Sequence, residues 1–403
     1  MRKFAIISLA MALGLALAVG AQAADTIKLA VMEPLSGNFK DIGDRYSEGV
    51  KFAAEVINAK GGINGKKLEV ILVDSELNPA VATRKATKLI MQDDVRHFCG
   101  GTGSSVAGAM EALNEKHNTL FFTYGMAAAS LTGDKCNRNF FRTCASTDMQ
   151  SYALANWVAQ KGFKKVFCIA QDYSFGKEAV AAFTKKLKEL NPQAEIVGEV
   201  LHPLGTKDFA PYVSQIISSG AEIVFTSNWG NDLTLLLKQA RPLGLKAKFA
   251  GYYLNDDLMI KAVADDEAVI GSVSAEIYML SIPGQANADF IAGFTQANGF
   301  YPTWLRGKAY TATMFWAEAV KKAGSDKVDD VIKAWEGLTY DGPAGKWTMR
   351  ACDHQVQQPV WIAEIVANNP YFKHAYVGPA TMVAPEKVSV PCEETGCKGF
   401  AKK

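Results

Sequence analysis

The 403-residue chain lacks an excess of charge of either sign, with 43 basic and 41 acidic residues. A near-neutral chain gives no general reason to expect nucleic acid or an anionic membrane surface as a partner. The composition also excludes disordered and collagen-like proteins, because 49% of the residues are hydrophobic and 21% are charged. The length predicts a folded protein with two domains of ordinary size.

Long hydrophobic runs are missing except at the start of the chain, where residues 4–19 follow the basic Arg2 and Lys3. This run is shorter than the roughly 20 residues that a membrane-spanning helix needs, which disfavours a membrane anchor. It leads into the small-residue pattern Ala21-Gln22-Ala23. We therefore predict that residues 1–23 are a signal peptide, cleaved near Ala23, and that the protein is released into an exported compartment.

None of the seven cysteines forms a Cys-x-x-Cys spacing, so the common zinc and dithiol redox motifs are absent. They are Cys99, Cys136, Cys144, Cys168, Cys352, Cys392 and Cys397. An exported compartment favours disulfides, and an odd number leaves at least one thiol unpaired. We expect Cys168 to stay free, because residues 166–170 resemble a buried strand. The other pairings stay open; Cys136 with Cys144, or Cys392 with Cys397, would close short loops.

From residue 25 onward, short apolar strands alternate with amphipathic helices, a pattern typical of parallel sheets covered on both faces. The predicted strands are 27–32, 68–73, a segment ending near 99, 120–123, 166–170, 196–200, 222–226, 249–251 and 359–366. The pattern restarts after residue 145, which favours two open doubly wound α/β sheets over one closed barrel. Asn78 and Pro79 predict a helix start, and residues 287–338 are predicted to be mostly helical.

The glycine-rich loop at residues 100–105 is the first candidate for chemistry, and three enzyme motifs fail there. A P-loop needs Lys and Ser or Thr where Ala109 and Met110 stand. A nucleophile elbow needs glycine at position 107, where Ala107 stands. A dinucleotide fingerprint needs glycine at position 106, where Val106 stands. Ser104 could bind a carboxylate at the start of the following helix. The alternative is a plain helix cap, which Ser105 could also supply.

The histidines are few and scattered, so we predict no catalytic base, metal site or cofactor from them. They are His97, His117, His202, His354 and His374. The paired acids Asp256-Asp257 lie beside polar loop residues and are expected to be solvated.

Aromatic residues follow three predicted strands directly: Phe175, Trp229 and the pair Tyr252-Tyr253. Open α/β sheets bind ligands at the carboxyl ends of their strands. The three positions together therefore predict a ligand pocket, although any one of them could serve packing alone.

A series of short motifs runs through the mature chain and is more specific than any single motif. The first group is Pro34-Leu35-Ser36-Gly37, Gly43, Gly49, Ile57-Asn58-Ala59-Lys60-Gly61-Gly62-Ile63-Asn64-Gly65, Asp74 and Pro79. The second group is Gln171-Asp172-Tyr173-Ser174-Phe175-Gly176, Lys207-Asp208-Phe209, Gln239-Ala240-Arg241 and Asp353-His354-Gln355. With these motifs the sequence resembles the type I periplasmic solute-binding proteins of branched-chain amino acid (Leu/Ile/Val-binding protein) ABC importers.

The resemblance implies two α/β lobes joined by three hinge crossovers, with a ligand in the cleft between them. Lobe one would comprise residues 24–144 and 275–354, and lobe two residues 145–274 and 355–403. Such proteins are periplasmic, monomeric carriers rather than enzymes. They deliver a small-molecule solute to an ABC permease in the membrane.

Carried over position by position, the family site falls on Ser104 and Thr102 for the ligand carboxylate and on the backbone of Gly125. Two positions depart from the family pattern: Ala127 replaces a threonine, and Tyr253 replaces the acid that pairs with the ligand ammonium. An alignment shift of a few residues could restore an acid through Asp256.

The family's tyrosines around the ligand correspond to Phe175 and Trp229, and the resemblance implies that Tyr252, Tyr253 and Tyr124 lie near them in the cleft. This aromatic cleft suits a flat carboxylate as well as leucine. The resemblance therefore implies a carrier for a branched-chain amino acid or a related small carboxylate. The alternatives are an aromatic carboxylate without an α-amino group, or a ligand-sensing module for a membrane receptor. A secreted hydrolase would need a nucleophile and base, and no such pair is recognisable.

Overall fold

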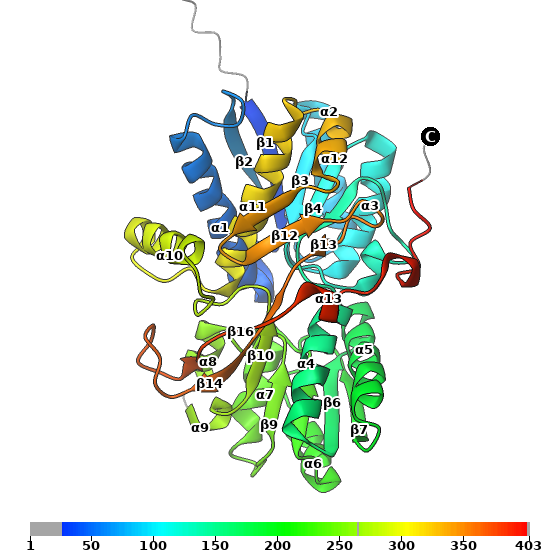
Figure 1. Cartoon of the computed structure of the whole chain (residues 1–403), viewed down its shortest axis with the longest axis vertical. Helices are drawn as coiled ribbons and strands as arrows, with labels where there is room; N and C mark the ends of the chain where they lie inside the picture. Colours follow the sequence, from blue (N-terminus) through cyan, green and yellow to red (C-terminus); the bar gives the residue numbers. More distant parts are fainter. Residues whose placement is uncertain (1–25, 264–265, 401–403) are drawn as a thin grey trace, which may run out of the picture.

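The computed structural model describes residues 26–263 and 266–400, so the predicted signal peptide at 1–23 lies outside the described residues. The chain folds into two α/β lobes stacked along the long axis of the molecule (Figure 1). The helices are η1 (Gly37–Phe39), α1 (Lys40–Ala59), α2 (Pro79–Asp93), α3 (Ser104–His117), η2 (Ala129–Thr132), α4 (Thr147–Lys161), α5 (Ser174–Leu190), α6 (Ala210–Ser219), α7 (Gly230–Ala240), α8 (Asp257–Val263), α9 (Asp266–Val269), α10 (Gln285–Asn298), α11 (Trp304–Ala323), α12 (Val328–Trp335), α13 (Pro385–Val388) and η3 (Cys392–Glu394). The strands are β1 (Thr26–Glu33), β2 (Lys67–Asp74), β3 (His97–Gly100), β4 (Leu120–Thr123), β5 (Phe140–Arg142), β6 (Lys165–Gln171), β7 (Glu195–His202), β8 (Ile223–Thr226), β9 (Lys248–Gly251), β10 (Val273–Glu276), β11 (Thr339–Gly342), β12 (Gly345–Met349), β13 (Val356–Gln357), β14 (Val360–Val366), β15 (Tyr376–Val377) and β16 (Thr381–Val383).

The first lobe is built on a fully parallel sheet of order β2-β1-β3-β4-β5. Alternate residues of β1 enter different cores: Leu29 and Val31 pack with α1 and α11, whereas Ala30 and Met32 pack with α2 and α3. Because both faces of β1 are buried, its sequence is a continuous apolar run. The strand order reverses between β1 and β3, which opens a crevice at their carboxyl ends.

The second lobe is built on a mixed sheet of order β15-β14-β10-β9-β8-β6-β7. Strands β6 to β10 are parallel, and β14, predicted as a late strand, pairs antiparallel with β10. The reversal arises because the chain re-enters this lobe beside the carboxyl end of β10, where Trp361 pairs with Glu276. Helices α4 and α5 pack together against the sheet, and the strand order reverses between β6 and β8.

Helices α10, α11 and α12 confirm the mostly helical segment predicted after residue 287. The sequence analysis did not predict the small antiparallel sheet β11-β12-β13, nor the pairing of β15 and β16 with β14. These strands have two to five residues, too few to display a period.

Where the chain passes between the lobes, segments that are distant in sequence are joined by hydrogen bonds. The Arg142 N–H donates to the His354 carbonyl at 2.9 Å, and the Gln355 side chain donates to the Cys144 carbonyl at 2.9 Å. Gln150 on α4 donates to the Ala275 carbonyl at 2.8 Å. These contacts bring residues near 144, 275 and 355 together at the junction.

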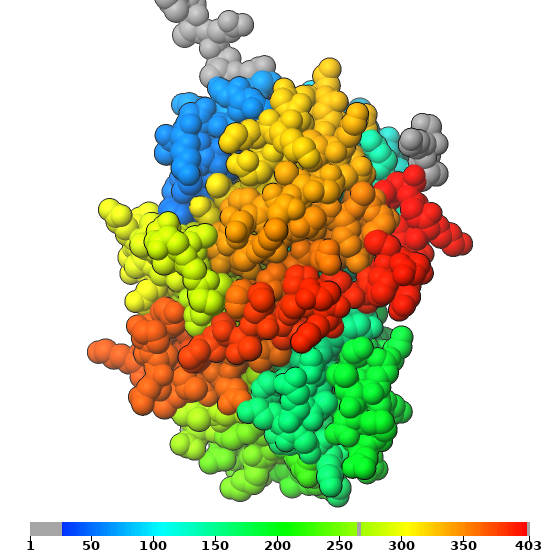
Figure 2. Space-filling model, in the orientation of Figure 1, coloured from blue at the N-terminus to red at the C-terminus, as the bar shows by residue number. Residues whose placement is uncertain are grey.

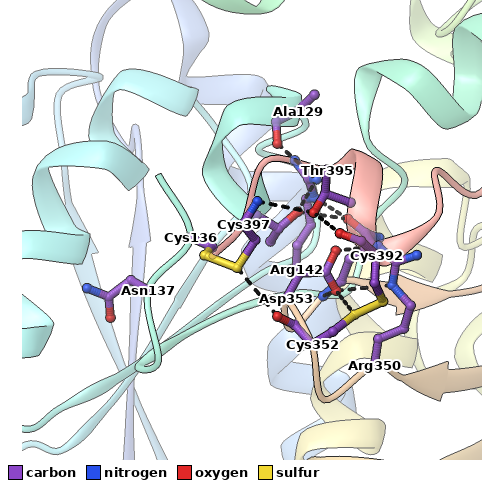
Figure 3. The surroundings of a disulfide bond; sticks show 12 residues. Ala129, Cys136, Asn137, Arg142, Arg350, Cys352, Asp353, Cys392, Thr395 and Cys397 are labelled. Atoms are coloured by element: carbon purple, nitrogen blue, oxygen red, sulfur yellow. Dashed lines mark hydrogen bonds and ion pairs between the residues drawn. A yellow bond between two sulfur atoms is a disulfide. The ribbon is translucent and has the colours of Figure 1, made fainter. Parts of the chain in front are cut away.

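The carboxyl-terminal segment makes a further passage that the sequence analysis did not anticipate. After α13, which packs on α4, the chain crosses back to the first lobe, and Figure 2 shows this segment in red along the boundary between the lobes. Cys397 is bonded to Cys136, and Cys392 to Cys352 (Figure 3). Two disulfides thus join this segment to Cys136 and Cys352, which the sequence analysis places in lobe one, whereas it places residues 355–403 in lobe two.

Cys168 is free and buried, as predicted, and Cys99 and Cys144 are also free and buried. The two local pairings considered from the sequence are wrong, because each bond joins cysteines 40 or 261 residues apart. Within residues 26–263 and 266–400, no helix combines the length and apolar character needed to cross a bilayer.

Candidate functional site

A small cavity of about 30 Å³ lies between the two lobes at the carboxyl ends of their parallel strands. Its lining residues are Ile42, Tyr46, Gly101, Thr102, Gly103, Ser104, Gly125, Tyr173, Phe175, Trp229, Tyr253 and Trp304. Aromatic rings from opposite lobes meet beside it: Phe39 lies 4.9 Å from Trp229, and Tyr253 stacks at 4.8 Å on Trp304. The two lobes are therefore in contact through aromatic rings beside the cavity.

Ser104 is the first residue of α3, and its backbone position places its hydroxyl at the positive end of the helix dipole. Its Oγ accepts a hydrogen bond from the Ala128 N–H at 3.3 Å. Because an acceptor lone pair is used there, the hydroxyl hydrogen stays available to a ligand oxygen. The helix cap is Gly103, which makes no side-chain cap bond, so Ser104 does not act as the plain cap considered from the sequence.

The floor of the cavity is formed by backbone from the loops after β3 and β4. A side chain at Gly125 would place its Cβ 2.2 Å from the Tyr46 hydroxyl and 2.5 Å from the Gly101 carbonyl. Only glycine fits this close approach. Beneath the loop, the Glu33 carboxyl accepts from the Gly101 N–H and the Thr102 hydroxyl, each at 2.6 Å.

The second lobe contributes an aromatic wall from the ends of β6, β8 and β9. Trp229 donates through Nε1 to the Tyr173 hydroxyl at 2.9 Å. Phe175 and Tyr253 are stacked with ring centroids 6.2 Å apart. This arrangement supplies flat apolar surfaces with fixed orientation on one side of the cavity.

No Asp, Glu, Lys, Arg or His is among the described residues that line the cavity. Two buried ion pairs lie beside residues of its lining. Asp256 receives two hydrogen bonds from Arg45, at 3.0 and 2.9 Å, and Lys308 pairs with Glu276 at 2.9 Å beneath the Tyr253 and Trp304 rings.

The expectation that Asp256 is solvated was wrong, because it is 4% exposed. Burial by itself would raise the pKa of Asp256, but the charge and hydrogen bonds of Arg45 hold it below its usual value. Asp256 therefore remains ionised and neutralised by the protein's own arginine.

The structure brings six of the predicted site residues together around the cavity: Thr102, Ser104, Gly125, Phe175, Trp229 and Tyr253. The other two, Ala127 and Tyr252, are buried and do not line it. The Ala127 carbonyl accepts from the Thr147 N–H at 2.8 Å, and the buried Tyr252 hydroxyl donates to the Thr147 carbonyl at 2.8 Å.

Sequence reasoning missed four cavity side chains: Ile42, Tyr46, Tyr173 and Trp304. Tyr173 stands in the motif with Phe175 and could have been included. Tyr46 and Trp304 come from α1 and α11, and no local signal indicates that these helix ends face the cleft. In the described chain, no group of three His, Cys, Asp or Glu residues is placed to hold a metal ion.

Comparison with known proteins gives one consistent result. Residues 26–370 match a family model described as "Periplasmic binding protein". The chain is 31% identical to the Leu/Ile/Val-binding protein homolog 4 of Brucella abortus (strain 2308), over 88% of this chain and 87% of that protein.

Solved structures agree with this match. The closed conformation of a leucine-, isoleucine-, valine-, threonine- and alanine-binding protein from Brucella ovis superimposes with a TM-score of 0.83 at 27% identity, covering 92% of this chain and 98% of that chain. A solute-binding protein of an R. palustris ABC transporter, solved with benzoate, shares the fold with a TM-score of 0.80 at 21% identity, covering 93% of this chain and 99% of that chain.

Proposed function

The chain belongs to the type I periplasmic binding proteins of the branched-chain amino acid family, and from this we propose that it is the solute-binding component of an ABC importer. In this role it captures a small carboxylate in the cavity between its lobes and delivers it unchanged to the permease. We place the ligand at the site residues predicted from the sequence: Ser104, Thr102, Gly125, Ala127, Phe175, Trp229, Tyr252 and Tyr253. Of these, Ala127 and Tyr252 are buried outside the cavity lining.

The observation that carries the proposal is the composition of the cavity wall. It offers a serine hydroxyl at a helix amino terminus and four aromatic rings from the second lobe, but no acid. The serine hydroxyl at the helix terminus can bind a carboxylate. The aromatic rings can contact a flat apolar body.

We further propose that the preferred ligand lacks an α-amino group. A buried ammonium without an acidic partner costs several kcal/mol, which aromatic contacts do not offset. Asp256, the acid that an alignment shift would supply, is already bound by Arg45 through both carboxylate oxygens. A benzoate-bound protein of the same fold illustrates that such ligands fit this architecture.

A branched-chain amino acid is the second candidate, and the named relative from Brucella abortus supports it. Its ammonium would need to displace Arg45 from Asp256, or be held by hydroxyl and carbonyl oxygens alone. Only the first of these arrangements requires Arg45 and Asp256 to separate in the complex.

We propose a periplasmic, monomeric protein, exported by the signal peptide at residues 1–23. Lobe one is proposed to consist of residues 24–144 and 275–354, with the disulfide-anchored segment from about 389 added to it. The two lobes would close on the ligand by hinge bending at the crossovers.

A thermal-shift panel tests the ligand class, because selective binding raises the melting temperature by mass action. Leucine, isoleucine, valine and phenylalanine are compared with 4-methyl-2-oxopentanoate, phenylpyruvate, benzoate and 4-hydroxybenzoate. We expect shifts with members of the second set only. A clear shift with leucine, isoleucine or valine and none with the deaminated acids would contradict the proposed preference. Mass spectrometry of the bound compound after incubation checks that it is recovered intact.

A further inference from the structure

Glu33 is a buried acid that contacts two lining residues at the floor of the cavity, and the proposed function does not use it. It is the last residue of β1 and fully buried. Its Oε1 accepts a hydrogen bond from the Gly101 N–H and its Oε2 accepts one from the Thr102 hydroxyl, each with a donor–acceptor distance of 2.6 Å. Thr102 also lines the cavity, so one side chain links the buried acid to the ligand space.

The surroundings of Glu33 contain no balancing cation. The groups that face it are Tyr46 from α1, Cys99 from β3 and Tyr124 after β4, and burial keeps the pKa of each far above its usual value. Asp74 on β2 is in register with Glu33, but its carboxylate is held by the N–H groups of Leu35 and Glu76, each at 2.9 Å. In the described part of the chain, Glu33 forms no ion pair with a Lys, Arg or His.

Burial therefore raises the pKa of Glu33 from 4.5 to about 8, and the contacts with Thr102, Tyr124 and Gly101 do not offset this. The carboxyl is mostly protonated at neutral pH.

The protonation state of Glu33 decides where the single Thr102 hydroxyl hydrogen points. When Glu33 is ionised, both of its oxygens are acceptors, so Thr102 must donate to it and has no hydrogen left for a ligand. When Glu33 is protonated, its own O–H donates to Thr102 Oγ1, and the Thr102 hydrogen turns toward the cavity. Ionisation also adds a second negative charge next to the place where a ligand carboxylate would lie beside Ser104.

We propose that Glu33 is a positioning residue that couples carboxylate binding to proton uptake: it is protonated in the complex and aims the Thr102 hydroxyl at the ligand. This inference rests on the proposed function only in requiring a carboxylate ligand. It holds equally for an amino acid and for a deaminated acid, because both carry that group.

Calorimetry between pH 6 and pH 9.5 tests the coupling, with the tightest binder among leucine, benzoate, 4-hydroxybenzoate, phenylpyruvate and 4-methyl-2-oxopentanoate as the probe. We expect the affinity of the wild-type protein to be constant below pH 7 and to fall toward about tenfold per pH unit above pH 8. Titrations at pH 8.5 in two buffers of different ionisation enthalpy should show uptake of up to one proton per ligand bound.

Glu33→Gln keeps an acceptor for the Gly101 N–H and a donor for Thr102 but cannot ionise. It should bind the probe at pH 7 within about threefold of wild type and lose most of the fall above pH 8. Glu111→Gln is the matched control, because Glu111 is also a buried acid with a pKa raised to about 8 but does not line the cavity. It should keep the wild-type pH profile.

The outcomes separate this inference from the proposed function. Leucine binding with proton uptake would overturn the proposed ligand class and support the role of Glu33. Binding of any probe with no pH dependence and no proton uptake in the wild-type protein would overturn the role of Glu33 alone, whether or not the variant folds. A panel in which no carboxylate binds at any pH would overturn both.

Discussion

Arg45 on α1 and Asp256 after β9 form a buried two-point ion pair that joins the lobes across the cleft. The guanidinium contacts the carboxylate at 3.0 and 2.9 Å, and both residues are almost fully buried. Because the two partners come from different lobes, opening of the cleft would separate them. We therefore expect the pair to act as a latch whose strength helps to set the balance between open and closed forms.

Asp256→Asn should shift this balance toward the open form. Arg45 would keep only the exposed Asp41 at 2.7 Å and the more distant Asp257 at 3.9 Å as acidic partners. Removing one partner of a buried pair typically costs about 3 to 5 kcal/mol, which here falls on the closed state. We expect weaker ligand binding and a larger radius of gyration by small-angle scattering. Asp41→Asn is the control, since Asp41 contacts Arg45 within α1 and its side chain is 60% exposed. Equal scattering profiles for wild type and Asp256→Asn would contradict the latch.

Ser104→Ala should weaken carboxylate binding. A hydrogen bond to a charged group is worth roughly 1.5 to 3 kcal/mol, which corresponds to about 10- to 150-fold in affinity. Ser105→Ala removes an exposed hydroxyl from the same turn of α3 and should have no effect. Calorimetry on the two variants makes the comparison, and unchanged affinity in Ser104→Ala would remove this serine from the site.

Stability should fall as the pH rises from about 4.5 to 8, and Glu111 should account for part of the loss. Burial raises the pKa of Glu111 from 4.5 to about 8, so the folded protein keeps a proton that the unfolded chain releases in this range. The full shift corresponds to roughly 5 kcal/mol of unfolding free energy lost by pH 8. Glu111→Gln should flatten the dependence in denaturant unfolding. Glu55→Gln, on an exposed face of α1, controls for the change in net charge, and an equal slope in both variants would count against the prediction.

The two disulfides should stabilise the protein to different extents. The Cys136–Cys397 bond closes a loop of 261 residues and the Cys352–Cys392 bond one of 40. Loss of either bond should lower the free energy of unfolding by about 2 to 5 kcal/mol. The loss should be greater in Cys136→Ser/Cys397→Ser, because breaking the longer loop returns more conformational entropy to the unfolded chain. The difference from wild type should vanish under full reduction. Peptide mapping that found Cys136 joined to Cys144, or Cys392 to Cys397, would refute the arrangement.

Local sequence patterns were sufficient for most of the elements and for much of the cavity. Asn78 caps α2 through the Ala80 and Val81 N–H groups, as its place before Pro79 predicts. Ser104, Phe175 and Trp229 were recognised because each follows a predicted parallel strand. The carboxyl ends of such strands share one edge of the sheet, so residues distant in sequence could be placed together without knowing any contact.

Short-range periodicity and motifs thus predict the alternation of strands and helices, the family, and residues on a polar and an aromatic side of the cleft. The contacts between the lobes follow from no such pattern. Arg45 and Asp256 are 211 residues apart, and Cys136 and Cys397 are 261 apart, so no local period relates them. Trp304 reaches the cavity because a crossover returns α11 to the first lobe. Asp256 is buried and neutralised rather than solvated because Arg45, on α1 of the other lobe, contacts its carboxylate. Such contacts depend on how two finished lobes pack, and that packing is set by the summed burial of many side chains rather than by the residues beside each contact.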